Sequence, residues 1–194
     1  LDMFSKYQLL SFGGSKDEFN EIFGEKCENY LDVAYDLING GFYERAIDVM
    51  DLSEKAYPMF DYVKAYCCGK LGDSGKESEL LKSAEAQDTG CCFPARLDDI
   101  AVLNNAICKN ESGDNAYYYL GCLFYDRFAY EKATALWEKC IALNPKHPKA
   151  FRNLALSYFD KKGDLLSAKE CMEIALANKP DDPRLILEYQ QILR

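Results

Sequence analysis

One spacing of residues recurs along this chain, and it constrains the fold more than any other feature. The stretch YYYLGCLFYDRFAYEKATALWEKCIALNP, residues 117–145, contains an aromatic residue, a Leu-Gly pair and a second aromatic residue, then an alanine, a tryptophan and a final proline. Apolar residues three and four positions apart lie on one face of a helix, so the stretch predicts two helices that end at the proline. A helix pair of this kind cannot bury its apolar face without neighbours of the same kind.

The same spacing returns in three other stretches. Residues 151–180 repeat it, and the final prolines of these two copies are 35 residues apart. Residues 30–58 repeat it near the N-terminus, and a degenerate copy covers residues 59–90. Together the copies predict a stack of antiparallel helix pairs, in which small residues stand where two helices approach closely and large residues fill the space between pairs. We expect Trp137 to be one of these core residues.

These residues resemble the tetratricopeptide repeat family. The resemblance implies an all-α fold, an α-solenoid of antiparallel helix pairs, and binding of proteins or peptides on a concave face lined by the first helix of each pair. Because the usual period is about 34 residues, we expect the extra residue of the last unit in the turn DKKGDLL, residues 160–166. The matching positions are Tyr117-x2-Leu120-Gly121-x2-Phe124, then Ala133-x3-Trp137 and Pro145.

A second resemblance concerns the segment before this unit. The sequence CCFPARLDDIAVL, followed by AYYYLGCLFYDRFAYEKATALWEK, is similar to the C-terminal repeat region of large bacterial proteins. The N-terminal part of those proteins is an uncharacterised domain related to carbohydrate processing. The resemblance implies an accessory role beside such a domain, and the absence of a starting Met leads us to expect that this chain is part of a longer protein.

The repeats divide the chain into segments of one predicted helical domain, residues 1–194. The segment between the second and third repeats is too long for a turn and predicts an extra helix near 94–109 that has no partner of its own. In chain order we expect N-terminal helices in 1–25, repeat 1 in 26–58, degenerate repeat 2 in 59–90, the extra helix in 91–112, repeat 3 in 113–146, repeat 4 in 147–181 and a capping helix in 182–194.

The individual helices follow from apolar periodicity and from the Gly and Pro breaks between them. They are expected near 2–11, 16–23, 26–39, 42–54, 58–71, 76–88, 94–109, 114–126, 130–143, 147–161, 165–178 and 182–193.

Charge and cysteine usage narrow the range of partners. The net charge is −9, of which residues 1–60 contribute −7, and an acidic chain repels phosphate backbones, so we expect no nucleic acid partner. No apolar run approaches the ~18 residues of a membrane helix, so we expect no membrane partner. The 9 cysteines show neither CxxC nor Cys/His ligand spacing. We therefore expect no metal site, but small apolar thiols at helix interfaces of a cytoplasmic protein in a reducing compartment.

Motifs that carry catalysis are not recognisable in the sequence. It has no Gly-rich phosphate loop, no G-x-S-x-G and no H-E-x-x-H. The only histidine, His147, lies in the inter-repeat turn NPKHP, where we expect it to be exposed. Asp181 and Asp182 precede Pro183 and are expected to cap the last helix. These features predict a non-enzymatic protein without a cofactor.

A candidate binding groove follows from the repeat offsets. Tyrosine offers a flat apolar face and a hydroxyl group, which suit extended peptides and sugar rings. Some family members hold a C-terminal carboxylate with paired Lys and Asn residues, but this chain has Glu28 and Asp32 at acidic groove positions, so we do not expect that specificity. The predicted groove residues are Tyr35, Tyr62, Tyr66, Tyr118, Tyr119, Tyr125 and the candidate anion contacts Lys149, Arg152 and Asn153.

Three hypotheses about function remain open at this point. The first is a scaffold that binds a protein or peptide in the groove. The second is an accessory domain that positions a carbohydrate-processing domain of the same parent chain. The third is self-association into a homo-oligomer through surfaces rich in cysteine and aromatic residues.

Overall fold

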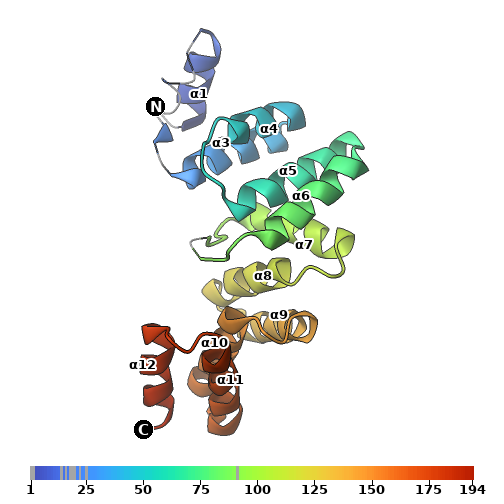
Figure 1. The fold of residues 1–194 in the computed structure, drawn as a ribbon. Helices are drawn as coiled ribbons and strands as arrows, with labels where there is room; N and C mark the ends of the chain where they lie inside the picture. The colour runs from blue at the N-terminus through green and yellow to red at the C-terminus, as the bar shows by residue number, and fades with distance from the viewer. Residues whose placement is uncertain are drawn as a thin grey trace. The chain divides into compact units, whose positions relative to one another are not determined.

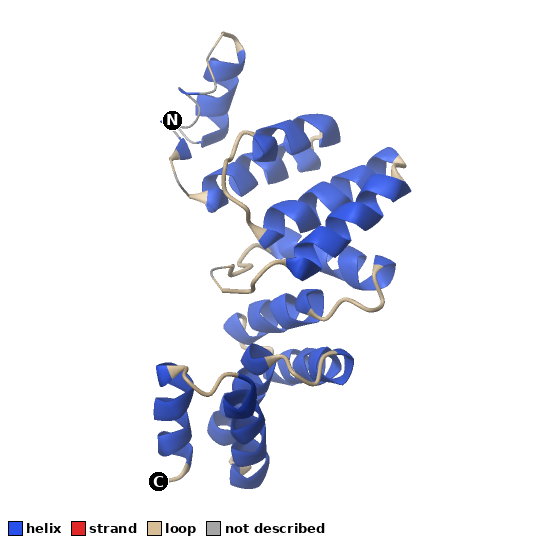
Figure 2. Ribbon diagram, viewed as in Figure 1, coloured by secondary structure: helices blue, strands red, loops and turns tan. Residues whose placement is uncertain are grey.

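The computed structural model describes residues 3–13, 15, 17, 21, 23, 24, 26–90 and 92–194. Throughout this part of the chain the secondary structure consists of helices and loops without strands (Figure 2). The all-α prediction is therefore confirmed. The helix expected at 16–23 falls largely on residues outside this description.

The chain divides into two compact units. Unit 1 comprises Leu1–Cys92 with Cys108–Asn110, and unit 2 comprises Phe93–Ile107 with Glu111–Arg194. Each unit contains two antiparallel helix pairs of its own. The single domain expected over residues 1–194 stays a prediction.

Unit 1 is built from two successive helix pairs (Figure 1). The first helix of each pair packs along the second, and α4 contacts α5, so the two pairs share one core. An additional N-terminal helix, α1, packs against α3. The helices of unit 1 are α1 (Met3–Ser11), α3 (Cys27–Asn39), α4 (Tyr43–Asp51), α5 (Pro58–Leu71) and α6 (Ser74–Ala86).

Unit 2 repeats this arrangement and adds a helix before and after the pairs. The pair α8 and α9 packs on the pair α10 and α11, and α12 packs on α11 as the predicted capping helix. The extra helix α7 stands outside these pairs, as predicted. The helices are α7 (Leu97–Lys109), whose last two residues are counted in unit 1, α8 (Asn115–Asp126), α9 (Tyr130–Leu143), α10 (Pro148–Ser157), the π-helix η1 (Tyr158–Lys162), α11 (Leu165–Asn178) and α12 (Pro183–Ile192).

Small residues lie where paired helices come closest. A Cβ placed on Gly121 would lie 2.4 Å from the indole Nε1 of Trp137, so only glycine fits against this ring. Trp137 is 2% exposed, and its Nε1 donates a hydrogen bond of 3.2 Å to the carbonyl oxygen of Tyr118. The prediction that Trp137 belongs to the core is confirmed. The alanines at the equivalent close approaches are also fully buried: Ala34, Ala46, Ala133, Ala155 and Ala168.

Aspartate side chains fix several helix starts. The carboxylate of Asp182 accepts a hydrogen bond from the backbone N–H of Arg184, which confirms the expected cap of the last helix. Asp99 is buried inside α7, and it accepts hydrogen bonds from the backbone N–H groups of Ala95 and Arg96. These bonds hold the preceding loop, so α7 begins at Leu97 and not near residue 94 as expected.

The turns between paired helices share one left-handed backbone position. Gly41, Gly72 and Gly163 occupy it with φ between 65° and 83°, and Phe128 occupies it in the third repeat with φ 61°. In the fourth repeat the N–H of Asp164 donates to the carbonyl oxygen of Tyr158, at the end of η1. The π-helix thus accommodates the extra residue, and it overlaps the start of the expected turn, residues 160–166.

Candidate functional site

The candidate groove residues of unit 2 come from one face of α8 and one face of α10. Lys149, Arg152 and Asn153 follow helical spacing on α10, and all three are half-buried. The amide Nδ2 of Asn153 lies 3.5 Å from the Sγ of Cys122 on α8. This contact joins the two helices at these faces.

The tyrosines predicted for the groove serve two different purposes. Tyr35, Tyr62, Tyr118 and Tyr119 are buried, so their rings belong largely to the cores of the two units. The hydroxyl of Tyr62, for example, donates a 2.7 Å hydrogen bond to Glu85 and so ties α5 to α6. The rings that keep accessible surface are those of Tyr66 and Tyr125.

Tyr125, one of these accessible tyrosines, packs against two other aromatic rings. Its ring centroid lies 5.4 Å from that of Trp137 and 4.9 Å from that of Tyr130. Burial raises the pKa of its hydroxyl, and the positive charge of Lys161 opposes this shift. Tyr125 therefore presents a neutral, rigidly held ring at the surface.

Arg152 already has an anionic partner within the chain. Its Nε donates a 2.6 Å hydrogen bond to Glu188 of α12, and a second guanidinium nitrogen binds the other carboxylate oxygen. Burial alone would raise the pKa of Glu188, but the hydrogen bonds and charges of Arg152 and Arg184 outweigh it and lower the pKa. One predicted anion contact is thus occupied by the capping helix.

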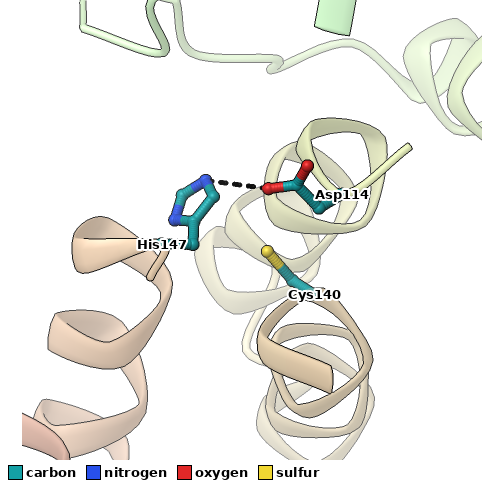
Figure 3. A group of neighbouring side chains, drawn as sticks. All are labelled: Asp114, Cys140 and His147. Atoms are coloured by element: carbon teal, nitrogen blue, oxygen red, sulfur yellow. Dashed lines mark ion pairs between the residues drawn. The ribbon is translucent and has the colours of Figure 1, made fainter. Parts of the chain in front are cut away.

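A second group of side chains meets where α8, α9 and α10 come together. Asp114 precedes α8, Cys140 lies in α9, and His147 precedes α10. Their ligand atoms lie within 4.8 Å of one another, and Figure 3 shows them gathered around one point. Sulfur, imidazole nitrogen and carboxylate oxygen are donors that Zn²⁺ accepts in proteins.

The hydrogen bonds of His147 argue against a metal at this point. Its Nδ1 accepts a 3.0 Å hydrogen bond from the backbone N–H of Ala150, which caps α10. The neutral ring therefore carries its proton on Nε2, which lies 3.2 Å from the Oδ1 of Asn115 and 4.0 Å from Asp114. A metal on Nε2 would need that proton to leave, and the other neutral tautomer would break the cap. The group is best described as a polar junction that fixes the start of α10.

This junction corrects one expectation from the sequence. His147 was expected to be exposed, but it is only 5% exposed, and burial lowers its pKa although Asp114 raises it. The sequence did contain a signal for this, because His147-Pro148 has the same form as the helix start Asp182-Pro183. Asp114 and Cys140 were missed because their spacing matches no ligand motif.

The cysteines are thiols wherever the structure describes them. None of the described cysteines forms a disulfide bond, and Cys27, Cys67, Cys68, Cys92 and Cys140 are buried, in agreement with small apolar residues at helix interfaces. A search of the described helices found none with the length and apolar character needed to cross a membrane.

A scan against models of known protein families gives no match. Solved structures similar to this chain include YrrB, a TPR protein with an unusual peptide-binding site, at 16% identity over 97% of this chain and 90% of that one, with a TM-score of 0.45. A thermophilic TPR protein in Thermus thermophilus shows 20% identity over 87% of this chain and 99% of its own, with a TM-score of 0.45. The first TPR of Spaghetti (RPAP3), bound to an HSP90 peptide, shows 14% identity over 70% and 92%, with a TM-score of 0.48.

The fold of this chain is assigned from its own repeats and helix pairs. The spacing of the repeats and the antiparallel pairs in both units carry the assignment, since a helix pair occurs in each of the four segments where the repeat spacing predicts one, although α4 ends three residues earlier than expected and α6 is shifted by two. The chain has an all-α fold of the tetratricopeptide repeat type, with an extra helix between the second and third pairs and a helix that caps the last.

Proposed function

We propose that this protein is a non-enzymatic scaffold that binds a protein or peptide segment on the first helices of its repeats. The observation that carries the proposal is the joined face of α8 and α10, where Tyr125, Lys149 and Asn153 are half-buried around the contact between Asn153 and Cys122. An asparagine amide can pair with a peptide backbone, a lysine can meet a carboxylate, and a held tyrosine ring can cover an apolar side chain.

The packing of the pairs also supports this proposal. The apolar faces of α8, α9, α10 and α11 are buried against one another, so the polar side chains on the first helices are held by a rigid framework. A ligand that meets such a framework loses less entropy than one that must order its own binding site. The half-buried side chains of α10 are therefore suited to bind a partner without a large rearrangement of the protein.

The test is affinity capture from a cell lysate with three forms of the protein. The forms are the native chain, the double variant Lys149→Ala/Asn153→Ala, and Lys169→Ala as a control on the exposed surface of α11. We expect a partner that the native chain and the control hold and that the double variant loses. Equal capture by all three forms would contradict the groove. Variants of Tyr118 and Tyr119 are unsuitable for this purpose, because both side chains are buried and their loss would disturb folding.

The alternative role, as an accessory to a carbohydrate-processing domain of the parent chain, rests on sequence resemblance alone and stays a prediction. The identity of the captured partner separates this role from the scaffold role, because an accessory domain would bind a segment of its own polypeptide. A cytoplasmic location likewise stays a prediction.

A further inference from the structure

The turn between α8 and α9 departs from the other three turns at a single residue. Glycine holds the left-handed position in those turns, and Phe128 holds it here with φ 61°. A Cβ added to Gly41, Gly72 or Gly163 would meet no atom within 4 Å, so the backbone conformation and not a lack of space favours glycine. A bulky side chain in this conformation is strained, and such strain is found mainly where function requires it.

Packing does not explain why phenylalanine stands at this position. The Phe128 side chain is 77% exposed, and its ring meets that of Tyr130 edge-on at 6.2 Å between centroids. The turn hydrogen bonds, from Phe128 N–H to Tyr125 and from Ala129 N–H to Phe124, involve only the backbone and would form equally with glycine. The side chain is thus exposed at the cost of backbone strain, with little burial to offset it.

A second departure from the repeat pattern lies next to the ring of Tyr130, which Phe128 contacts. The extra residue of the fourth repeat forms the π-helix η1, and π-helical insertions of this kind are frequent at functional sites. Lys161 of η1 holds its Nζ 4.5 Å from the ring centroid of Tyr130, the ring that Phe128 also contacts. Lys162 lies 4.6 Å from the ring centroid of Tyr158. Two independent irregularities of the array therefore converge on Tyr130.

The charges around this place leave the two lysines available. Neither Lys161 nor Lys162 forms an ion pair within the described part of the chain. Of the nearby acidic residues, Asp126 pairs with Arg127, and Asp164 caps α11 and is within electrostatic reach of Lys162. Asp160, exposed and next to Lys161 in η1, is the remaining acidic group that a ligand carboxylate would compete with. An ammonium group that rests on an aromatic ring keeps its outer side open to a carboxylate.

We propose that Phe128, Tyr130, Lys161 and Lys162 form a docking surface, the turn surface, for a peptide segment with a large apolar side chain beside an acidic one. The apolar side chain packs on the rings of Phe128 and Tyr130, and the carboxylate binds the ammonium groups of Lys161 and Lys162. The turn surface uses none of the predicted groove residues. It therefore goes beyond the proposed function and does not depend on it.

The test is a selection of random peptides displayed on phage, with the native chain as bait. We expect recovered peptides to carry an acidic residue beside an aromatic or large aliphatic one. We also expect their affinity, measured with synthetic copies by fluorescence anisotropy, to fall by about tenfold or more in Phe128→Gly, as for removal of a central contact residue. The double variant Lys161→Glu/Lys162→Glu should lose these peptides and prefer copies in which the acidic residue is replaced by lysine.

Two controls test whether Phe128 is needed for peptide binding or for the folding of the turn. Phe128→Gly should unfold at the same temperature as the native chain or a higher one, because glycine relieves the left-handed strain, and Phe128→Asn should behave similarly. Lys146→Glu, an exposed charge change elsewhere in unit 2, should leave peptide affinity unchanged. The proposal is overturned if no peptide is selected, if the peptides bind Phe128→Gly equally well, or if that variant unfolds several degrees earlier. Peptides that depend on Lys149 and Asn153 but not on Phe128 would support the groove and overturn the turn surface.

Discussion

At the scale of single residues, His147 shows how a turn residue takes on a structural role through burial. Its Nδ1 caps α10 and its Nε2 faces Asn115 and Asp114, so both ring nitrogens are used by the fold. The neutral ring is the form that fits these partners. Protonation would place a hydrogen on Nδ1, where the backbone N–H of Ala150 already points.

The first prediction concerns the pKa of this residue. Because His147 is the only histidine, its ring resonances can be followed by NMR without ambiguity, and burial should hold its pKa below the ordinary 6.5. A histidine whose pKa is lowered by folding stabilises the protein above its ordinary pKa, and this contribution is lost as the pH falls through the lowered value.

Stability should therefore decrease between neutral pH and the lowered pKa, as measured by denaturant unfolding at several pH values. In His147→Asn, whose amide oxygen can still cap α10, this part of the pH dependence should disappear. A measured pKa at or above 6.5 would contradict the prediction.

The second prediction compares two glycines inside helices. An added Cβ would lie 2.4 Å from Trp137 Nε1 at Gly121, and 2.6 Å from the Glu77 carboxylate at Gly69. Both changes to alanine gain about 1 kcal/mol of helix propensity. The indole ring cannot yield, so Gly121→Ala should destabilise by about 1–3 kcal/mol of overpacking. The Glu77 carboxylate is buried but is the end of a flexible side chain, so Gly69→Ala should cost less than Gly121→Ala. Chemical denaturation of both variants checks this, and equal effects would show that the rigidity of the neighbour does not decide the result.

At the scale of helices, the sequence predicted most of the elements closely. The bounds of α5, α9 and α11 agree with expectation, and α5 and α11 begin at clear breaks, at Pro58 and after Gly163. The sequence located the extra residue near residues 160–166, but it did not show that a π-helix at the end of α10 takes it up. The pairing of Arg152 with Glu188 was missed for a related reason: it joins helices that are far apart in sequence, and no local pattern reports it.

The sequence also did not predict that the side chains of Tyr118 and Tyr119 are buried. Repeat offsets place a residue on a helix, but the neighbouring pair decides how much of its side chain is covered. The groove residues that keep exposed surface are accordingly a subset of those predicted.

The third prediction concerns the attachment of α12. Leu185 and Ile192 bury its apolar face together with Met172, and Glu188 adds the ion pair with Arg152. Glu188→Gln should speed amide hydrogen exchange in α12 while leaving α9 unchanged. Glu170→Gln, an exposed change on α11, is the matched control.

The contribution of Glu188 to the stability of α12 should depend on pH. The pKa of Glu188 is lowered by folding, so its contribution is present at neutral pH and is lost as the pH falls below the ordinary value of 4.5. The exchange rates of native α12 should then approach those of the variant in acid. Identical exchange of both proteins at neutral pH would contradict a stabilising role for the pair.

At the scale of the whole molecule, we expect the two units to have separate stabilities and to unfold at different denaturant concentrations. Each unit has a core of its own, and arrays of repeats often unfold in stages because each repeat contacts only its neighbours. A single free energy of unfolding is then an incomplete description of the protein.

The fourth prediction follows from this arrangement. Met172→Ala removes a fully buried side chain from unit 2 and should cost about 2–5 kcal/mol. Hydrogen exchange should accelerate most in α10, α11 and α12 and much less in α3 and α4. Met50→Ala is the matched change in unit 1 and should give the opposite distribution. Uniform acceleration along the whole chain would show that the units unfold as one.

The position of the single tryptophan gives this molecule a localised optical reporter. Trp137 is the only tryptophan in the chain, and it is enclosed by Gly121, Tyr125 and the carbonyl of Tyr118 within the third repeat. Its emission therefore responds to the opening of one helix pair, whereas circular dichroism averages over every helix. A difference between the two signals during unfolding would reveal the order in which the repeats lose their structure, without any label.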